Sequence, residues 1–132
     1  MQQEKTKQIS AGIVVVVLIG LLAFFAISCH NSNKRWQEAK ANFENSVNKT
    51  IAMYGPSVDH IYVSGASVSI YMDVERWDNS SKDIRNGFMK EVTGLIRVDA
   101  VQSNILEYTD VKLFFLTSDR EQIAAYTIKN ED

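Results

Sequence analysis

The chain has 132 residues, and its 14 Lys or Arg against 16 Asp or Glu give a formal net charge of −2. This length accommodates one small domain and a membrane anchor, and it excludes two full domains. From Asn31 onward, twelve basic and fifteen acidic residues give a net charge of −3, which excludes the basic face of a nucleic-acid-binding protein. The single cysteine, Cys29, excludes an intramolecular disulfide and a zinc site built from several thiolates.

An uncharged, apolar segment occupies the N-terminal part of the sequence. No charged residue occurs from Gln8 to Asn33, and 13 of the 19 positions from Ile9 to Ile27 are Ile, Val, Leu or Phe. At about 1.5 Å per residue, a helix of this length spans roughly the 30 Å of a bilayer's hydrocarbon core. We predict that residues 1–29 form a transmembrane helix or a lipoprotein-type signal segment. Residues 30–132 are then expected to fold as one small α+β domain.

The end of the apolar run, Leu22–Cys29, resembles a bacterial lipobox. In a lipobox a small residue, here Ser28, precedes a cysteine that receives a lipid and becomes the new N-terminus. Two departures are that Ala26 stands where Leu is usual, and that the run exceeds the roughly 7–15 apolar residues of a typical signal peptide. Two alternatives therefore stay open: a retained single-pass helix, or a lipid attached to Cys29. Either one anchors the protein to membrane lipid.

The basic residues on the two sides of the apolar run are almost balanced. Lys5 and Lys7 precede it, and Lys34, Arg35 and Lys40 follow it. The distribution of positive charge alone therefore does not orient the segment. A short N-terminal tail before a signal-like run usually stays in the cytoplasm, so we expect the domain to be extracytoplasmic.

The first part of the domain predicts a helix and then a hairpin. Apolar residues at three- and four-residue steps predict a helix from Trp36 to Tyr54, which Gly55-Pro56 ends. Trp36 belongs either to an aromatic belt at the membrane interface or to the edge of the core. Gly65-Ala66 between alternating segments is typical of a type II′ β-hairpin, whose second strand is expected to continue to Val74. The predicted cross-strand pairs are Ser64 with Ser67, Val63 with Val68, Ile61 with Ile70, and His60 with Tyr71.

A second helix and a second hairpin follow. The helix is expected to begin near Ser80, with Asp83 completing a capping box. Its predicted buried stripe is Ile84, Phe88, Val92, Leu95 and Ile96. Strands are predicted at Val111–Thr117 and Gln122–Lys129, and the first of them is apolar on both faces, as a central strand is. The fold class is therefore α+β in the order α-β-β-α-β-β, with a four-stranded, mainly antiparallel sheet and two helices on one face.

Only His60 has neighbours that suggest chemistry. Asp59 precedes it, but residues adjacent in a strand point to opposite faces, so we expect no acid–base pair. His60 and Asp73 supply at most two metal ligands, where a metal site uses three or four. The sequence contains no glycine-rich phosphate loop and no calcium-loop spacing, and with two histidines it offers no assembled catalytic triad. We therefore expect no catalytic residue, metal or cofactor, and no enzymatic activity.

The outer face of the first hairpin combines aromatic and small polar side chains, as many protein contact surfaces do. The alternative is that this is the ordinary wet face of an antiparallel sheet. The candidate contact residues are His60, Tyr62, Ser69, Tyr71 and Asp73. We expect a membrane-anchored, non-catalytic interaction or assembly subunit, whose partner is another protein or a second copy of the chain. The alternative function is an anchored module that binds a small ligand or acts as a sensor.

Overall fold

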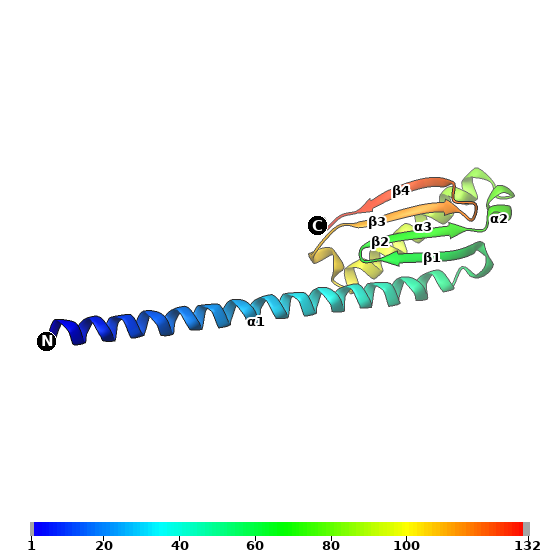
Figure 1. The fold of residues 1–132 in the computed structure, drawn as a ribbon. Helices are drawn as coiled ribbons and strands as arrows, with labels where there is room; N and C mark the ends of the chain where they lie inside the picture. Colours follow the sequence, from blue (N-terminus) through cyan, green and yellow to red (C-terminus); the bar gives the residue numbers. More distant parts are fainter. Residues whose placement is uncertain (1, 131–132) are drawn as a thin grey trace. The chain divides into compact units, whose positions relative to one another are not determined.

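The structure is a computed structural model that describes the backbone of residues 2–130 and the side chains of residues 18–23 and 33–130. The chain divides into two compact units, Met1–Arg35 and Trp36–Asp132. Figure 1 labels the helices and strands along it. In chain order they are α1 (Gln2–Ala52), η1 (Gly55–Ser57), β1 (Val58–Ser64), β2 (Ser67–Met72), α2 (Val74–Asp78), α3 (Lys82–Gln102), η2 (Ile105–Glu107), β3 (Val111–Thr117) and β4 (Gln122–Ile128).

The predicted anchor, residues 1–29, falls in the first unit, which is helical from Gln2 onward. Within residues 1–29, only the side chains of residues 18–23 are described, and those are exposed. The rest of the apolar run, and the side chain of the lipidation candidate Cys29, lie outside the described residues. In the part of the chain that is described, no helix is both long enough and apolar enough to cross a membrane.

The first hairpin forms as the sequence predicts. Its register pairs Ser64 with Ser67 and continues through the three further predicted pairs. Gly65 has a φ of 59°, whereas Ala66 is not among the residues with positive φ. A turn with positive φ at its first central residue alone is the pattern of the II′ type, and glycine adopts it without a steric cost.

The second strand is shorter than predicted, because a helix begins where the alternation of apolar residues still continues. β2 ends at Met72, and Val74 is already the first residue of α2. The cause is Asp73, whose carboxylate accepts a hydrogen bond from the Arg76 backbone N–H at 3.0 Å and so caps the new helix. The prediction of a strand up to Val74 was therefore wrong.

Helix α3 begins one residue later than expected. The side chain of Ser81, not Ser80, accepts the N-terminal hydrogen bond, here from the Ile84 backbone N–H at 3.2 Å. Ile84 was predicted to be buried but is 64 % exposed, because it lies in the first turn of the helix beyond the core. The residues of α3 that are buried are Met89, Val92, Ile96, Asp99 and Ala100.

The four strands lie side by side in sequence order, as Figure 1 shows. The two hairpins are antiparallel, but the central pair, β2 with β3, is parallel. A parallel pair needs a crossover connection, and α2 and α3 lie in that connection. The fold is thus α+β with a mixed sheet that is mostly antiparallel, and β3 has the central position predicted for it.

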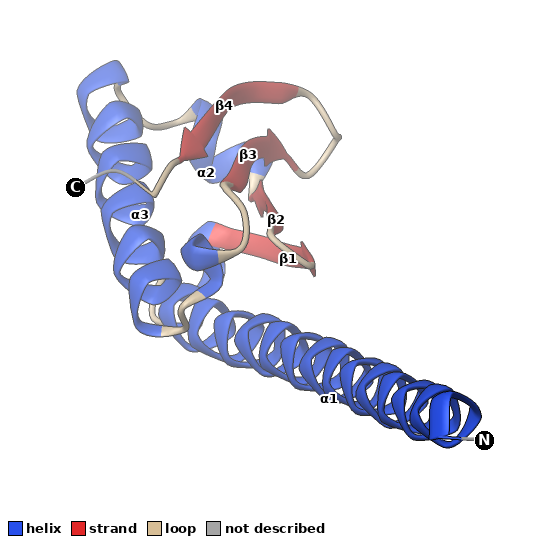
Figure 2. Ribbon diagram, turned by 90° about the vertical axis from the view of Figure 1, so that its left-hand side faces the viewer, coloured by secondary structure: helices blue, strands red, loops and turns tan. Residues whose placement is uncertain are grey.

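One face of the sheet and two helices enclose the core. Figure 2 shows α3 beside the sheet, and the helical residues from Trp36 to Ala52 contribute the other part of this layer. The predicted stripe of the first helix is confirmed, since Ala39, Phe43, Val47 and Ile51 are buried. Trp36 is half-buried and packs against the core. From the sheet, the buried side chains are Val68, Ile70, Met72, Val111, Leu113, Phe115, Thr117 and Ile128.

Candidate contact surface

The outer face of the sheet is the side away from the core, and its side chains lie in rows across the strands. The register places them in three rows. They are His60–Tyr71–Leu116–Gln122, Tyr62–Ser69–Phe114–Ala125 and Ser64–Ser67–Lys112–Thr127. The predicted contact residues of the first hairpin therefore continue into aromatic and aliphatic groups of β3, which the sequence analysis did not include.

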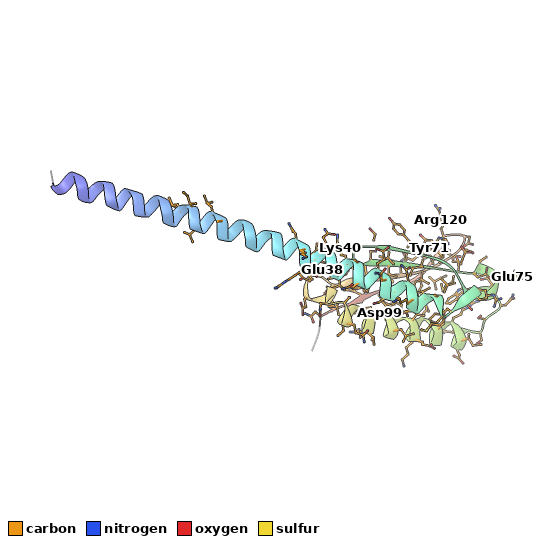
Figure 3. All side chains as sticks on the ribbon, turned by 90° about the horizontal axis from the view of Figure 1, so that it is seen from below. Glu38, Lys40, Tyr71, Glu75, Asp99 and Arg120 are labelled. Atoms are coloured by element: carbon orange, nitrogen blue, oxygen red, sulfur yellow. The ribbon has the colours of Figure 1, made fainter. Side chains whose placement is uncertain are left out.

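The large side chains of this outer face are exposed or half-buried. Tyr62 is 64 % exposed, while Tyr71, Phe114 and Leu116 are half-buried among their neighbours in the sheet. Figure 3 places Tyr71 on the sheet side of the domain and Asp99 on the helix side. The apolar character of β3 on both pleat faces was the sequence signal for Phe114 and Leu116, because a strand covered on one face alone should alternate.

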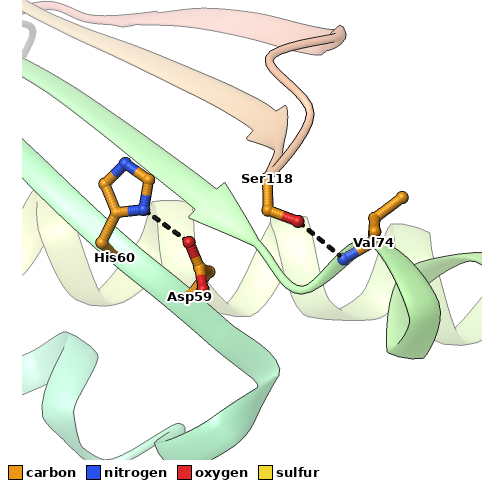
Figure 4. A network of polar contacts seen from close by, with 4 residues as sticks. All are labelled: Asp59, His60, Val74 and Ser118. Carbon is orange, nitrogen blue, oxygen red and sulfur yellow. Dashed lines mark hydrogen bonds and ion pairs between the residues drawn. The ribbon is translucent and has the colours of Figure 1, made fainter.

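Asp59 and His60 do form a pair, so the expectation that they point to opposite faces was wrong. The Asp59 Oδ2 atom lies 2.7 Å from the His60 Nδ1 atom (Figure 4). The cause is a β-bulge, since Val58 pairs with Met72 and His60 already pairs with Tyr71, which leaves Asp59 without a partner. An extra residue in a strand breaks the alternation of its side chains.

The Asp59–His60 pair lies on the surface of the domain. The His60 ring stacks on Tyr71, with ring centroids 4.1 Å apart and an angle of 11° between the planes. The side chains of His60 and Asp59 remain 55 % and 48 % exposed. The rings of His60 and Tyr71 and the carboxylate of Asp59 thus lie beside one another on an exposed face.

Asp73, the fifth predicted contact residue, has a different position from the other four. It follows the end of β2 and caps α2 with its carboxylate. Nearby, the Ser118 hydroxyl accepts a hydrogen bond from the Val74 backbone N–H at 3.2 Å, which ties the end of β3 to the start of α2 (Figure 4). The structure therefore brings His60, Tyr62, Ser69 and Tyr71 together and places Asp73 at the margin.

Two polar contacts join the helices of the core, and the sequence analysis did not single out either of them. The Thr50 hydroxyl donates a hydrogen bond of 2.7 Å to the Asp99 carboxylate, and both side chains are buried. At the rim, the Tyr54 hydroxyl donates to the Glu91 carboxylate at 3.0 Å. Burial of the phenol, together with this carboxylate, raises the pKa of Tyr54 to about 12.

Several depressions lie on the surface of the described residues. One of about 90 Å³ lies where α2 and α3 meet the sheet, and Trp77 and Phe88 line it. Sites for small organic ligands commonly measure about 300–1,000 Å³. A broader depression of about 500 Å³ around Arg76 is lined by polar side chains alone. A third depression of about 320 Å³ is lined by Asn86, Lys90 and Thr93 of α3 and by Tyr126 of β4, and it is open to solvent. None of the three is both apolar and enclosed, as a typical ligand pocket is.

Within the described residues, no group of three or more His, Cys, Asp or Glu side chains comes together where it could hold a metal ion.

No protein-family model matches this sequence, and comparison with curated proteins and with solved structures finds no similar chain.

Proposed function

We propose that this protein is a membrane-tethered interaction subunit, and that the outer face of its sheet binds another protein. The observation that carries the proposal is the difference between the faces of the sheet. Helices cover the inner face, while Tyr62, Tyr71, Phe114 and Leu116 lie on the outer face without a covering layer in the described residues. Aromatic side chains of this kind contribute most of the binding energy in many protein interfaces.

The chemistry of the outer face also favours a protein partner. Apart from the Asp59–His60 pair at its margin, the only charged side chain in the three rows is Lys112, whose ammonium donates to the Thr127 hydroxyl at 3.2 Å. A face with few charges and several aromatic groups loses little solvation energy when a partner covers it. The three depressions described above are small or open to solvent, and they give the ligand-binding alternative no comparable support.

The tether is proposed from the sequence. A run without charge from Gln8 to Asn33 fits a bilayer, either as a retained helix or as a signal segment that ends at a lipidated Cys29. Labelling with radioactive palmitate in a bacterial host separates these two forms. Incorporation into the wild type but not into Cys29→Ser indicates the lipid, and a membrane-bound protein without label indicates the retained helix.

Photocrosslinking in intact membranes tests the contact surface. A benzoylphenylalanine in place of Tyr62 is compared with one in place of Arg97, which is exposed on α3. We expect a discrete adduct from position 62 only, and we expect Leu116→Asp in the same chain to remove it. Equal adducts at both positions, or an adduct that persists with Leu116→Asp, would contradict the proposed surface.

A further inference from the structure

Strand β4 forms one edge of the sheet, and β3 is its only neighbouring strand in the described structure. The backbone hydrogen bonds of Gln122–Ile128 within the described residues go to β3. Along the other side of β4, the N–H and C=O groups that point away from β3 therefore have no partner there. Such an edge is a template for a further strand.

The two edges of the sheet differ in how they are protected. In β1, the bulge at Asp59 and the charge of that residue both hinder the addition of a strand. β4 has no charged residue in its seven positions, and its exposed side chains include Ile123 and Tyr126, which are 37 % and 41 % exposed. Its own register shift lies at its beginning, where Leu116 pairs with Gln122, so that Ala124–Ile128 forms a regular segment.

The two residues that directly flank β4 carry charges of opposite sign. Further out in the sequence, Asp119 and Arg120 carry one charge of each sign, and the last two residues of the sequence are acidic. Glu121 precedes the strand and Lys129 follows it, both are exposed, and no ion pair involves either one in the part of the chain that is described. When two such strands pair antiparallel, each Glu121 approaches the Lys129 of the other copy. Parallel pairing would instead bring like charges together, which is unfavourable.

We propose that a second copy of this chain pairs with β4 in antiparallel orientation, with Ala125, the residue midway between Glu121 and Lys129, on the two-fold axis. The register shift at Gln122 moves Glu121 by one position relative to a regular strand. The Glu and Lys side chains are long enough to meet across this additional distance. Closed two-fold symmetry uses the same patch on both copies. The two four-stranded sheets then form one sheet, and their outer faces become continuous. This pairing goes beyond the proposed function, because it is made by the backbone edge of β4 and uses neither the anchor nor the aromatic side chains of the outer face.

Disulfide trapping in intact membranes tests the geometry with the full chain. Residues facing each other across an antiparallel pair have Cα atoms about 4.5–5.5 Å apart, which a disulfide spans. With Cys29 retained, so that either form of the anchor is preserved, Ala125→Cys is expected to give a covalent dimer on mild oxidation beyond any dimer formed by the wild type through Cys29 alone. Ser64→Cys, on the exposed end of the opposite edge strand β1, is the matched control and is expected to give no more dimer than the wild type. Equal dimer from both positions, or no more from position 125 than from the wild type, overturns the proposal.

Charge reversal tests the orientation independently. Glu121→Lys and Lys129→Glu each convert both unlike pairs of the dimer into like pairs, and we expect each to weaken dimerisation of the detergent-solubilised full chain about tenfold. Mixing the two variants restores unlike pairs at both ends, so a heterodimer of wild-type affinity is expected. Sedimentation equilibrium of each variant and of the mixture measures this. A mixture no tighter than the separate variants overturns the antiparallel arrangement.

Discussion

The two faces of the sheet are formed by the same four strands, but their side chains have very different surroundings. On β3, Phe115 points to the inner face and is fully buried, while its neighbour Phe114 points to the outer face and is half-buried. On β2, Ile70 and Tyr71 differ in the same way. Folding of this domain therefore uses the inner face, because that is where α1 and α3 supply apolar partners.

Because the two faces differ in this way, effects on stability and effects on binding can be separated in this protein. Substitutions on the inner face should destabilise the fold, whereas substitutions on the outer face should leave the fold intact and weaken the proposed contact. On the outer face, Tyr62 is exposed, and Phe114 and Leu116 are half-buried.

The largest effect is expected from neighbouring phenylalanines on β3. Phe115→Ala removes a fully buried ring and should lower the free energy of unfolding by about 3–5 kcal/mol. Phe114→Ala removes a half-buried ring on the outer face and should cost about 1 kcal/mol. Pulse proteolysis in urea, with the full chain in mild detergent, measures both. Equal losses would mean that the outer face is also part of the folding core.

The next largest effect is expected at the buried hydrogen bond between Thr50 of α1 and Asp99 of α3. Thr50→Val leaves the Asp99 carboxylate buried without its hydrogen-bond donor, which should cost about 1–3 kcal/mol. Thr93→Val is the control, because the Thr93 hydroxyl bonds only to the Met89 carbonyl of its own helix and should matter little. Thr50→Val with Asp99→Leu should recover part of the loss in the same urea assay. No recovery would show that the loss does not arise from an unpaired carboxylate.

Glycine-to-alanine substitutions are expected to change stability in opposite directions in the turn between β1 and β2 and in helix α3. Gly65→Ala forces a Cβ into a residue with a φ of 59° and should destabilise the protein by about 1–2 kcal/mol. Gly87→Ala lies in α3, where an added Cβ meets nothing within 4 Å, and should stabilise by about 0.5–1 kcal/mol. Thermal unfolding followed by circular dichroism distinguishes the opposite signs. Two shifts of the same sign would contradict the assigned turn.

The smallest effect is a pH dependence at the rim between the helices. The pKa of Tyr54 is raised to about 12, against about 10 in the unfolded chain, so its contribution to stability is complete below pH 10. Between pH 10 and 12 the unfolded chain loses this proton first, and the contribution declines. Absorbance titration of the wild type should show an ionisation near pH 12 that is missing in Tyr54→Phe. Glu91→Gln should move it downward, and an unchanged value would exclude Glu91 as a cause.

Much of the fold follows from local patterns in the sequence. The hairpin register is fixed by Gly65-Ala66 together with the alternation of Val63, Val68 and Ile70, and it forms as predicted. The two boundaries that differ from the predicted ones depend on single polar side chains. Asp73 ends β2 by capping a helix, and Ser81 rather than Ser80 caps α3, although both serines have the residue type of a cap.

The candidate surface was predictable only within one hairpin. His60, Tyr62, Ser69 and Tyr71 share a face because of period-two alternation, which the sequence displays directly. Phe114 and Leu116 join them through the parallel pairing of β2 with β3, and nothing local in the sequence specifies that contact. The bulge that brings Asp59 to His60 could not be predicted from the sequence either, because a bulge is defined by the pairing of two strands.

The parallel pair at the centre of the sheet has a consequence for the order of folding. Each hairpin closes over a short loop, but Ser67 meets Lys112 only after the chain has passed through α2 and α3. Contacts between distant parts of a chain form slowly, because the entropy of a long loop is lost before they stabilise anything. We expect the two hairpins to form first and to join later along β2 and β3. In pulsed hydrogen exchange, amides bonded between β2 and β3 should then gain protection after those within each hairpin, and simultaneous protection would contradict this order.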